Sequence, residues 1–143
     1  GLMSIGLYSR VARRGLARLQ AMVQELALSR DRDGVRALRR RLLEDPARRF
    51  EILSYDFYST SGCRDLLFHF MEHQYTPLQL DAAMRELGLE FLGFVPRDAA
   101  TLQRYRDLYP QDRTLTDLHN WELYERRFPD TFARMIRCWC RKA

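Results

Sequence analysis

The run from Asp65 to Phe94 combines three local signals that together require a sheet. Thr76 and Gln79 match the N-cap and the capping-box partner of a helix, with a proline at its first position. Gly88 stands where such a helix ends in the left-handed region. The following residues, 89–94, are apolar at nearly every position, which is typical of a strand covered on both faces. Neighbouring strands must therefore exist elsewhere in the chain.

Two further segments have strand character. The segment 2–8, LMSIGLY, is apolar and precedes Ser9, which can cap a following helix. In 134–141, residues such as Ile136 and Cys138 alternate with charged or aromatic ones; a helical periodicity also fits, and we predict a strand. The other segments have helical periodicity, and we predict helices at about 10–28, 33–43, 47–55, 64–72, 77–87, 99–109 and 117–127.

Composition is typical of a folded chain, because 46% of its 143 residues are apolar. No apolar run approaches the roughly 20 residues of a membrane span, and no signal segment is evident, so a cytoplasmic protein is expected. The three cysteines, Cys63, Cys138 and Cys140, form no CxxC pair. We therefore expect reduced thiols rather than a disulfide framework or a zinc site.

Positive charge is concentrated near the N-terminus. Residues 10–49 carry twelve arginines against five acids, whereas 50–143 carry twelve basic residues against fourteen acids. Such asymmetry can indicate nucleic-acid binding. However, 23 of the 24 basic residues are arginine throughout the chain, and those near the N-terminus lie on helices with an apolar opposite face. A solvated helix face is the simpler interpretation, and a nucleic-acid partner is not expected.

Three segments resemble the C-terminal half of class I S-adenosylmethionine-dependent methyltransferases. The opening GLMSIGLYS is similar to the end of a proline-glycine-glycine turn and the fifth strand. The stretch from DFYSTSGCRD to LGLEFLGF resembles a bacterial subgroup often fused to tetratricopeptide repeats. The closing DTFARMIRCWCRK, with Lys142, is similar to the last strand of that subgroup.

The resemblance implies an α/β, helix-rich, Rossmann-like fold. The predicted strands would be the fifth, sixth and seventh of the fold, forming a three-stranded mixed sheet (order 5-7-6) with the seventh antiparallel. Residues 1–143 would be a single partial domain, in which 10–64 form a helical insertion or lid and 65–143 the remaining helices and strands. Helices 10–28 and 77–87 would cover the sheet.

A half-fold has consequences for partners and cofactor. The resemblance implies a missing N-terminal methyltransferase half, whose fourth strand would pair with segment 2–8. Without it, the edge Leu2–Tyr8 invites a homo-oligomer. Cofactor binding in this fold needs a glycine-rich turn, and the isolated glycines here form no GxGxG cluster. We expect no cofactor in this chain alone, no activity on its own, and S-adenosylmethionine in the full-length protein.

The loop YDFYSTSGCRD is the candidate substrate-binding lid. Its Tyr58, Ser61, Cys63 and Arg64 are candidate contacts for a methyl acceptor. The structural alternatives are that a hydroxyl caps the next helix and that Cys63 is a small core residue.

His69 and His73 admit three interpretations. They spell HxxEH with Glu72, the inverted zinc-protease pattern, provided that 69–73 is helical. They can instead contact the methyl acceptor, since an imidazole titrates near neutral pH; or they are structural. No third zinc ligand is evident, so a zinc hydrolase is the weaker hypothesis.

The last alternative is a helical protein-interaction or regulatory module. Aromatic residues are frequent in 104–128, and a face of that composition can bind a protein. Their helical spacing, for example at Leu118, Trp121 and Tyr124, makes core packing the simpler account.

Overall fold

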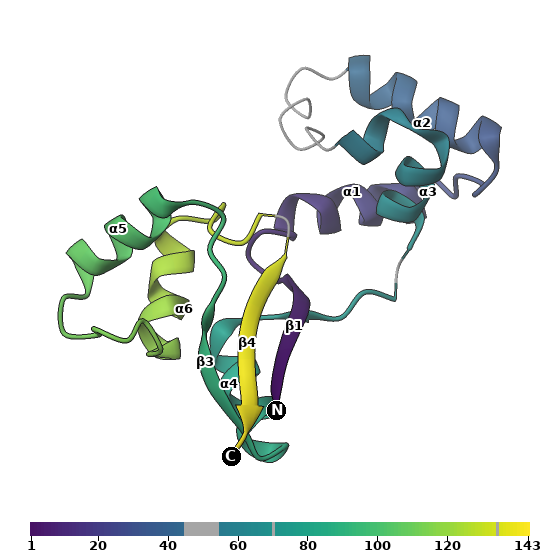
Figure 1. Cartoon of the computed structure of the whole chain (residues 1–143). Helices are drawn as coiled ribbons and strands as arrows, with labels where there is room; N and C mark the ends of the chain where they lie inside the picture. Colours follow the sequence, from purple (N-terminus) through teal and green to yellow (C-terminus); the bar gives the residue numbers. More distant parts are fainter. Residues whose placement is uncertain (45–54, 70, 134) are drawn as a thin grey trace. The chain divides into compact units, whose positions relative to one another are not determined.

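A computed structural model describes residues 1–44, 55–69, 71–133 and 135–143 of the chain (Figure 1). The chain divides into two compact units: residues 1–13 with 73–143, here called the sheet unit, and 14–72, here called the helical unit. The predicted helix 47–55 lies outside the described residues except for its last position.

The sheet unit has an α/β architecture around a four-stranded mixed sheet. Its strands are β1 (Leu2–Ser9), β2 (Gln74–Tyr75), β3 (Leu89–Phe94) and β4 (Ile136–Lys142), in the spatial order β2-β1-β4-β3. β4 is antiparallel to both β1 and β3, whereas β2 is parallel to β1. The predicted α/β class is confirmed, but the predicted count of three strands is wrong. β2 has only two residues, too few to show a periodicity of two in the sequence.

β4 resolves the ambiguity between strand and helix in favour of the strand. Ile136, Cys138 and Cys140 are fully buried, while Arg137 and Trp139 between them are exposed. Successive side chains of a strand point to opposite faces, so one face of β4 joins the core and the other does not. The period of two was therefore the decisive signal.

α4 (Pro77–Glu86) follows the predicted capping chemistry. The Thr76 hydroxyl accepts a hydrogen bond from the Gln79 amide N–H, and the Gln79 side chain accepts one from the Thr76 N–H. Gly88 has φ of 63°, the left-handed conformation that glycine adopts without a Cβ penalty. α4 packs against β3, so a short turn suffices to connect helix and strand.

α5 (Ala99–Leu108) and α6 (Leu118–Arg127) supply an aromatic core rather than an aromatic surface. The rings of Tyr105 and Trp121 stack at 3.9 Å between centroids, and Tyr124 packs beside both. All three are at most 1% exposed. The aromatic binding face considered for 104–128 is therefore mostly core.

The helical unit contains α1 (Arg14–Glu25), α2 (Arg32–Glu44), the 3₁₀ turn η2 (Tyr55–Tyr58) and α3 (Thr60–Phe68). α1 begins later than predicted, because residues 10–13 form a turn closed by the Arg13 N–H and the Ser9 carbonyl. α3 begins four residues earlier than predicted, because Ser59 caps it, and it ends at Phe68 instead of residue 72. The core of the unit consists of Leu16, Leu19, Val23, Val35, Leu38, Leu42, Phe57, Cys63, Leu67 and Phe68.

Gly34 on α2 provides a test of packing in the helical unit. A Cβ at this position would lie 2.0 Å from the Ser29 carbonyl oxygen, so the backbone would have to move. We expect Gly34→Ala to destabilise the chain by about 1–3 kcal/mol, although helix propensity alone favours alanine. Urea unfolding followed by circular dichroism measures the change.

Ala37→Gly is the matched control, because Ala37 is exposed on the same helix. Helix propensity alone predicts that Ala37→Gly lowers the free energy of unfolding by about 0.5–1 kcal/mol. A Gly34→Ala protein more stable than the parent would contradict the steric contact.

Candidate functional site

Three predicted acceptor contacts lie on the surface of the helical unit. Tyr58 ends η2 and is 69% exposed, while Ser61 and Arg64 are exposed on α3. Ser61 and Arg64 are three residues apart on a helix, so they lie on one side of it. The phenol, hydroxyl and guanidinium groups of these three residues are therefore accessible.

Cys63 does not belong to this row. Its side chain is fully buried in the core of the helical unit. Burial raises the pKa of its thiol, and the nearby Arg39 guanidinium offsets this only in part. The thiol therefore has the environment of an inert core residue, the structural alternative considered for it.

The two histidines do not share a helix. α3 ends at Phe68, and His69 caps it with an extended backbone (φ −96°, ψ 96°). His69 belongs to the helical unit and His73 to the sheet unit, where it precedes β2. The helical spacing that the HxxEH pattern needs is absent, and the predicted helix over 64–72 is wrong at this end. Among the described residues, no three metal-ligating side chains lie close enough to hold an ion.

Side chains from α1 and α2 hold both ends of the segment that carries Tyr58 and Ser61. The Arg39 guanidinium donates to the carbonyls of Phe57 and Ser59, with its Nε 2.9 Å from the Phe57 oxygen. The Ser59 hydroxyl accepts from the Gly62 N–H at 2.9 Å. The Gly62 N–H is one of the donors that the N-terminus of a helix leaves without a backbone partner, so Ser59 satisfies it, and Arg39 adds hydrogen bonds between α2 and the start of α3.

The C-terminal end of α3 is held in the same way. Gln20 donates to the carbonyls of Leu66 at 3.0 Å and His69 at 3.2 Å, and Arg30 donates to that of Phe68. The positive charge of Arg30 is favourable beside the negative end of the helix dipole. His69 is thereby fixed through its backbone, while its side chain is exposed.

Sequence patterns missed a buried polar contact at the end of β1. The Ser9 hydroxyl donates to the Glu125 carboxylate of α6 and accepts from the Ala12 N–H at 3.0 Å. Ser9 is 1% exposed and Glu125 is fully buried. The contact joins residues 116 positions apart, so no local motif could indicate it. It fixes the carboxyl end of β1 against α6.

A second buried carboxylate ties α4 to α6. Glu122 accepts a hydrogen bond from the Leu78 N–H at 3.2 Å and from Arg126 at 2.9 Å. Burial raises the pKa of Glu122, but the hydrogen bonds that the carboxylate accepts, together with the positive charge of Arg126, outweigh this, and the net shift is downward. A carboxylate beside a helix N-terminus is electrostatically favourable. Glu122 is thus structural.

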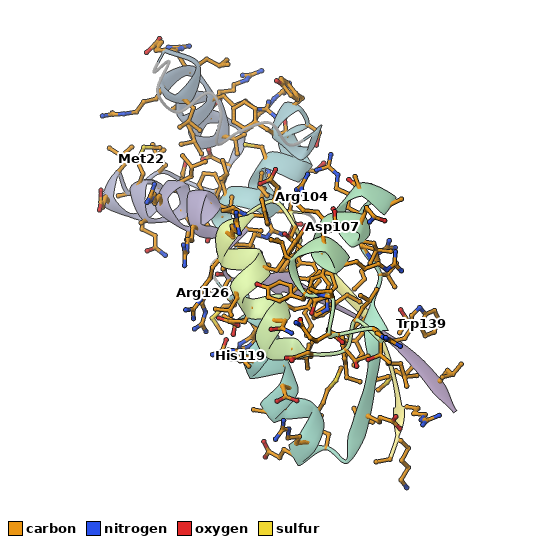
Figure 2. The ribbon with its side chains drawn as sticks, turned by 90° about the vertical axis from the view of Figure 1, so that its left-hand side faces the viewer. Met22, Arg104, Asp107, His119, Arg126 and Trp139 are labelled. Atoms are coloured by element: carbon orange, nitrogen blue, oxygen red, sulfur yellow. The ribbon has the colours of Figure 1, made fainter. Side chains whose placement is uncertain are left out.

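In the described part of the chain, β1 over residues 2–7 and β3 each lack a strand neighbour on one side, and one face of the sheet is open. β2 pairs with β1 only at Tyr8 and Ser9, so residues 2–7 have a strand partner on the β4 side alone. On the face opposite the buried residues of β4, Trp139 is 45% exposed and lies between small residues, Ser4 on β1 and Gly93 on β3. Figure 2 shows Trp139 projecting away from α6.

We call the edge 2–7 together with the Trp139 face the open sheet surface. An exposed apolar strand without charges, proline or a bulge is a template for further pairing. Trp139 lies on this face between the exposed Arg137 and Arg141 of the same strand, and tryptophan and arginine are enriched at the centres of protein contacts. Partner binding is therefore the chemistry that this arrangement supports.

Searches against protein families and curated proteins found no match to the chain. No helix among the described residues is long and apolar enough to cross a membrane. The function is therefore inferred from the residues and their geometry.

Ser9→Ala tests the contact at the end of β1. The change removes a hydrogen-bond donor from the buried Glu125 carboxylate, and we expect a loss of about 1–3 kcal/mol in the free energy of unfolding. Ser4→Ala on the same strand is the control, since Ser4 is exposed and should change stability by less than about 0.5 kcal/mol. If Ser9→Ala and Ser4→Ala destabilise the chain equally in thermal unfolding, this would argue against the Ser9–Glu125 hydrogen bond.

Thiol reactivity tests the burial of the cysteines. All three are free and buried, and burial raises the pKa of Cys138 from 9.0 to about 11. We expect slow labelling by a disulfide reagent at pH 8 and complete labelling in denaturant. Because the folded pKa exceeds the unfolded one, Cys138 stabilises the fold below about pH 9, and this stabilisation is lost as the pH rises through about 11. Rapid labelling of the folded chain would contradict the burial.

Proposed function

We propose that this chain is the C-terminal, acceptor-side part of an S-adenosylmethionine-dependent methyltransferase. The resemblance described above suggests the family, and the strand arrangement supports it. β4 lies between β1 and β3 and is antiparallel to both, as expected of the seventh strand between the fifth and sixth. β2, in this proposal, is an addition beside the fifth strand.

The open sheet surface is the observation that carries the proposal. β1 has the apolar composition of an interior strand, yet its edge at residues 2–7 is unpaired among the described residues. The proposed upstream half would supply the strand beside β1 and cover Trp139. It would also supply the glycine-rich turn for the cofactor, so this chain alone is inactive.

The exposed residues Tyr58, Ser61 and Arg64 are the proposed acceptor contacts, with His69 and His73 nearby in sequence. The hydrogen bonds from Arg39 and Gln20 support this role, because groups that position a substrate must themselves be fixed. Methyl transfer needs the nucleophile in line with the sulfonium, and a base is optional. A histidine that accepts a proton is compatible with this chemistry.

Cofactor binding tests the assignment. We expect no heat of binding when S-adenosylhomocysteine is titrated into this chain, and saturable binding once the upstream segment is restored by fusion. The reason is that the backbone turn that approaches the cofactor lies in that segment. A restored protein that does not bind the cofactor would refute the proposal.

Trp139→Ala tests the open sheet surface separately. Truncating a tryptophan at a contact centre typically costs 2 kcal/mol or more, so association with a separately expressed upstream segment should weaken by at least about tenfold. Leu123→Ala is the matched control, because Leu123 is 42% exposed but lies on α6. Equal weakening by both variants would exclude Trp139 as the contact.

Without its partner segment, the chain is proposed to self-associate through the edge of β1. Sedimentation over a range of concentrations should then show a species larger than the monomer. A strictly monomeric chain at high concentration would show that the edge does not pair with a second copy.

A further inference from the structure

The segments that precede α5 and β4 lie at the same end of the sheet. β1 and β3 are each antiparallel to β4, so they run in the same direction. Their carboxyl ends therefore lie at the same end of the sheet. β3 ends at Phe94 and β4 begins at Ile136, which places the start of α5 and the segment 128–133 near this end of the sheet. Open α/β sheets characteristically bind ligands outside the carboxyl ends of their strands.

A cavity of about 290 Å³ lies between these two segments. This volume is just below the usual range for small-molecule sites, roughly 300–1,000 Å³, so it suits a small ligand. The residues that matter for its chemistry are Arg97, Asp98, Thr101, Arg104, Phe128 and Asp130. All of them belong to the sheet unit.

Arg104 is held in place at the wall of the cavity. Its guanidinium carbon lies 4.8 Å from the ring centroid of Phe128, a cation–π contact. A guanidinium positioned in this way loses less conformational freedom when it binds a ligand.

The two carboxylates that line the cavity differ in what they do. Asp98 caps α5 and accepts hydrogen bonds from the Thr101 N–H at 2.8 Å and hydroxyl at 2.7 Å. Its charge is thereby committed to the helix N-terminus. Asp130 is exposed, and its negative charge would oppose an anion. Removing that charge should therefore strengthen anion binding.

We propose that this cavity binds a small ligand through an oxyanion, a phosphate or a carboxylate, held between Arg97 and Arg104 with Phe128 as an apolar wall. The planar guanidinium fork matches the paired oxygens of both groups. The site uses none of the residues assigned to the acceptor surface or to the open sheet surface. It therefore stands independently of the methyltransferase proposal.

An NMR titration of the whole chain at constant ionic strength tests the site, with sodium phosphate and sodium acetate as probes. Saturable shifts of the Thr101 and Thr131 amides in the millimolar range are expected. Arg97→Gln should weaken binding about tenfold, equivalent to about 1.4 kcal/mol, and Asp130→Asn should strengthen it. Arg113→Gln removes the same charge from a position outside the cavity and should leave the affinity unchanged.

The outcomes separate the alternatives. Non-saturable shifts, or equal weakening by Arg97→Gln and Arg113→Gln, would overturn the site in favour of a general charge effect. Arg104→Lys keeps the charge and removes the planar fork, so it tests Arg104 even if Arg104→Gln unfolds the chain; unchanged affinity would overturn its role. Tighter binding of phosphate supports a phosphate-bearing ligand, and tighter binding of acetate supports a carboxylate-bearing one.

Discussion

The antiparallel pairing of β4 with both β1 and β3 is the constraint on which the sheet unit depends. It joins the two ends of the chain, since Leu2 lies opposite Arg141, and it places the fully buried Ile136, Cys138 and Cys140 at the centre of the core. Without β4, β1 and β3 would have no common neighbour. The aromatic stack of α5 and α6 packs with these residues in one cluster, so the helices depend on the same pairing.

Polar contacts then fix the positions of individual helices and strands, which the apolar core alone leaves undetermined. A hydrophobic core is non-directional, whereas a buried carboxylate must meet specific donors. Glu125 with Ser9 ties α6 to the end of β1, and Glu122 with the Leu78 N–H ties α6 to the start of α4. In the helical unit, Arg39, Gln20 and Arg30 position α3 through its carbonyls. Both units therefore present defined surfaces.

Predictions from the sequence are confirmed where the signal is local. The capping box at Thr76, the glycine stop at Gly88 and the alternation in 136–141 each depend on neighbours a few residues away. Predictions are wrong where contacts with a distant residue determine the local structure. α3 was expected to continue past His69, but carbonyl contacts from Gln20 and Arg30 close the helix at Phe68. Among the candidate site residues, exposure separated Tyr58, Ser61 and Arg64 from Cys63, which the loop composition could not do.

The sequence by itself determined the α/β class, most of the helices and the three main strands, because propensity, capping and hydrophobic period are properties of short segments. Tertiary structure alone decided the fourth strand, the Ser9–Glu125 contact, the open sheet surface and the cavity beside Arg104. Each of these arises from residues far apart in the chain, with Ser9 and Glu125 separated by 116 positions. Such contacts leave no local pattern, since the packing of the whole unit brings the groups together.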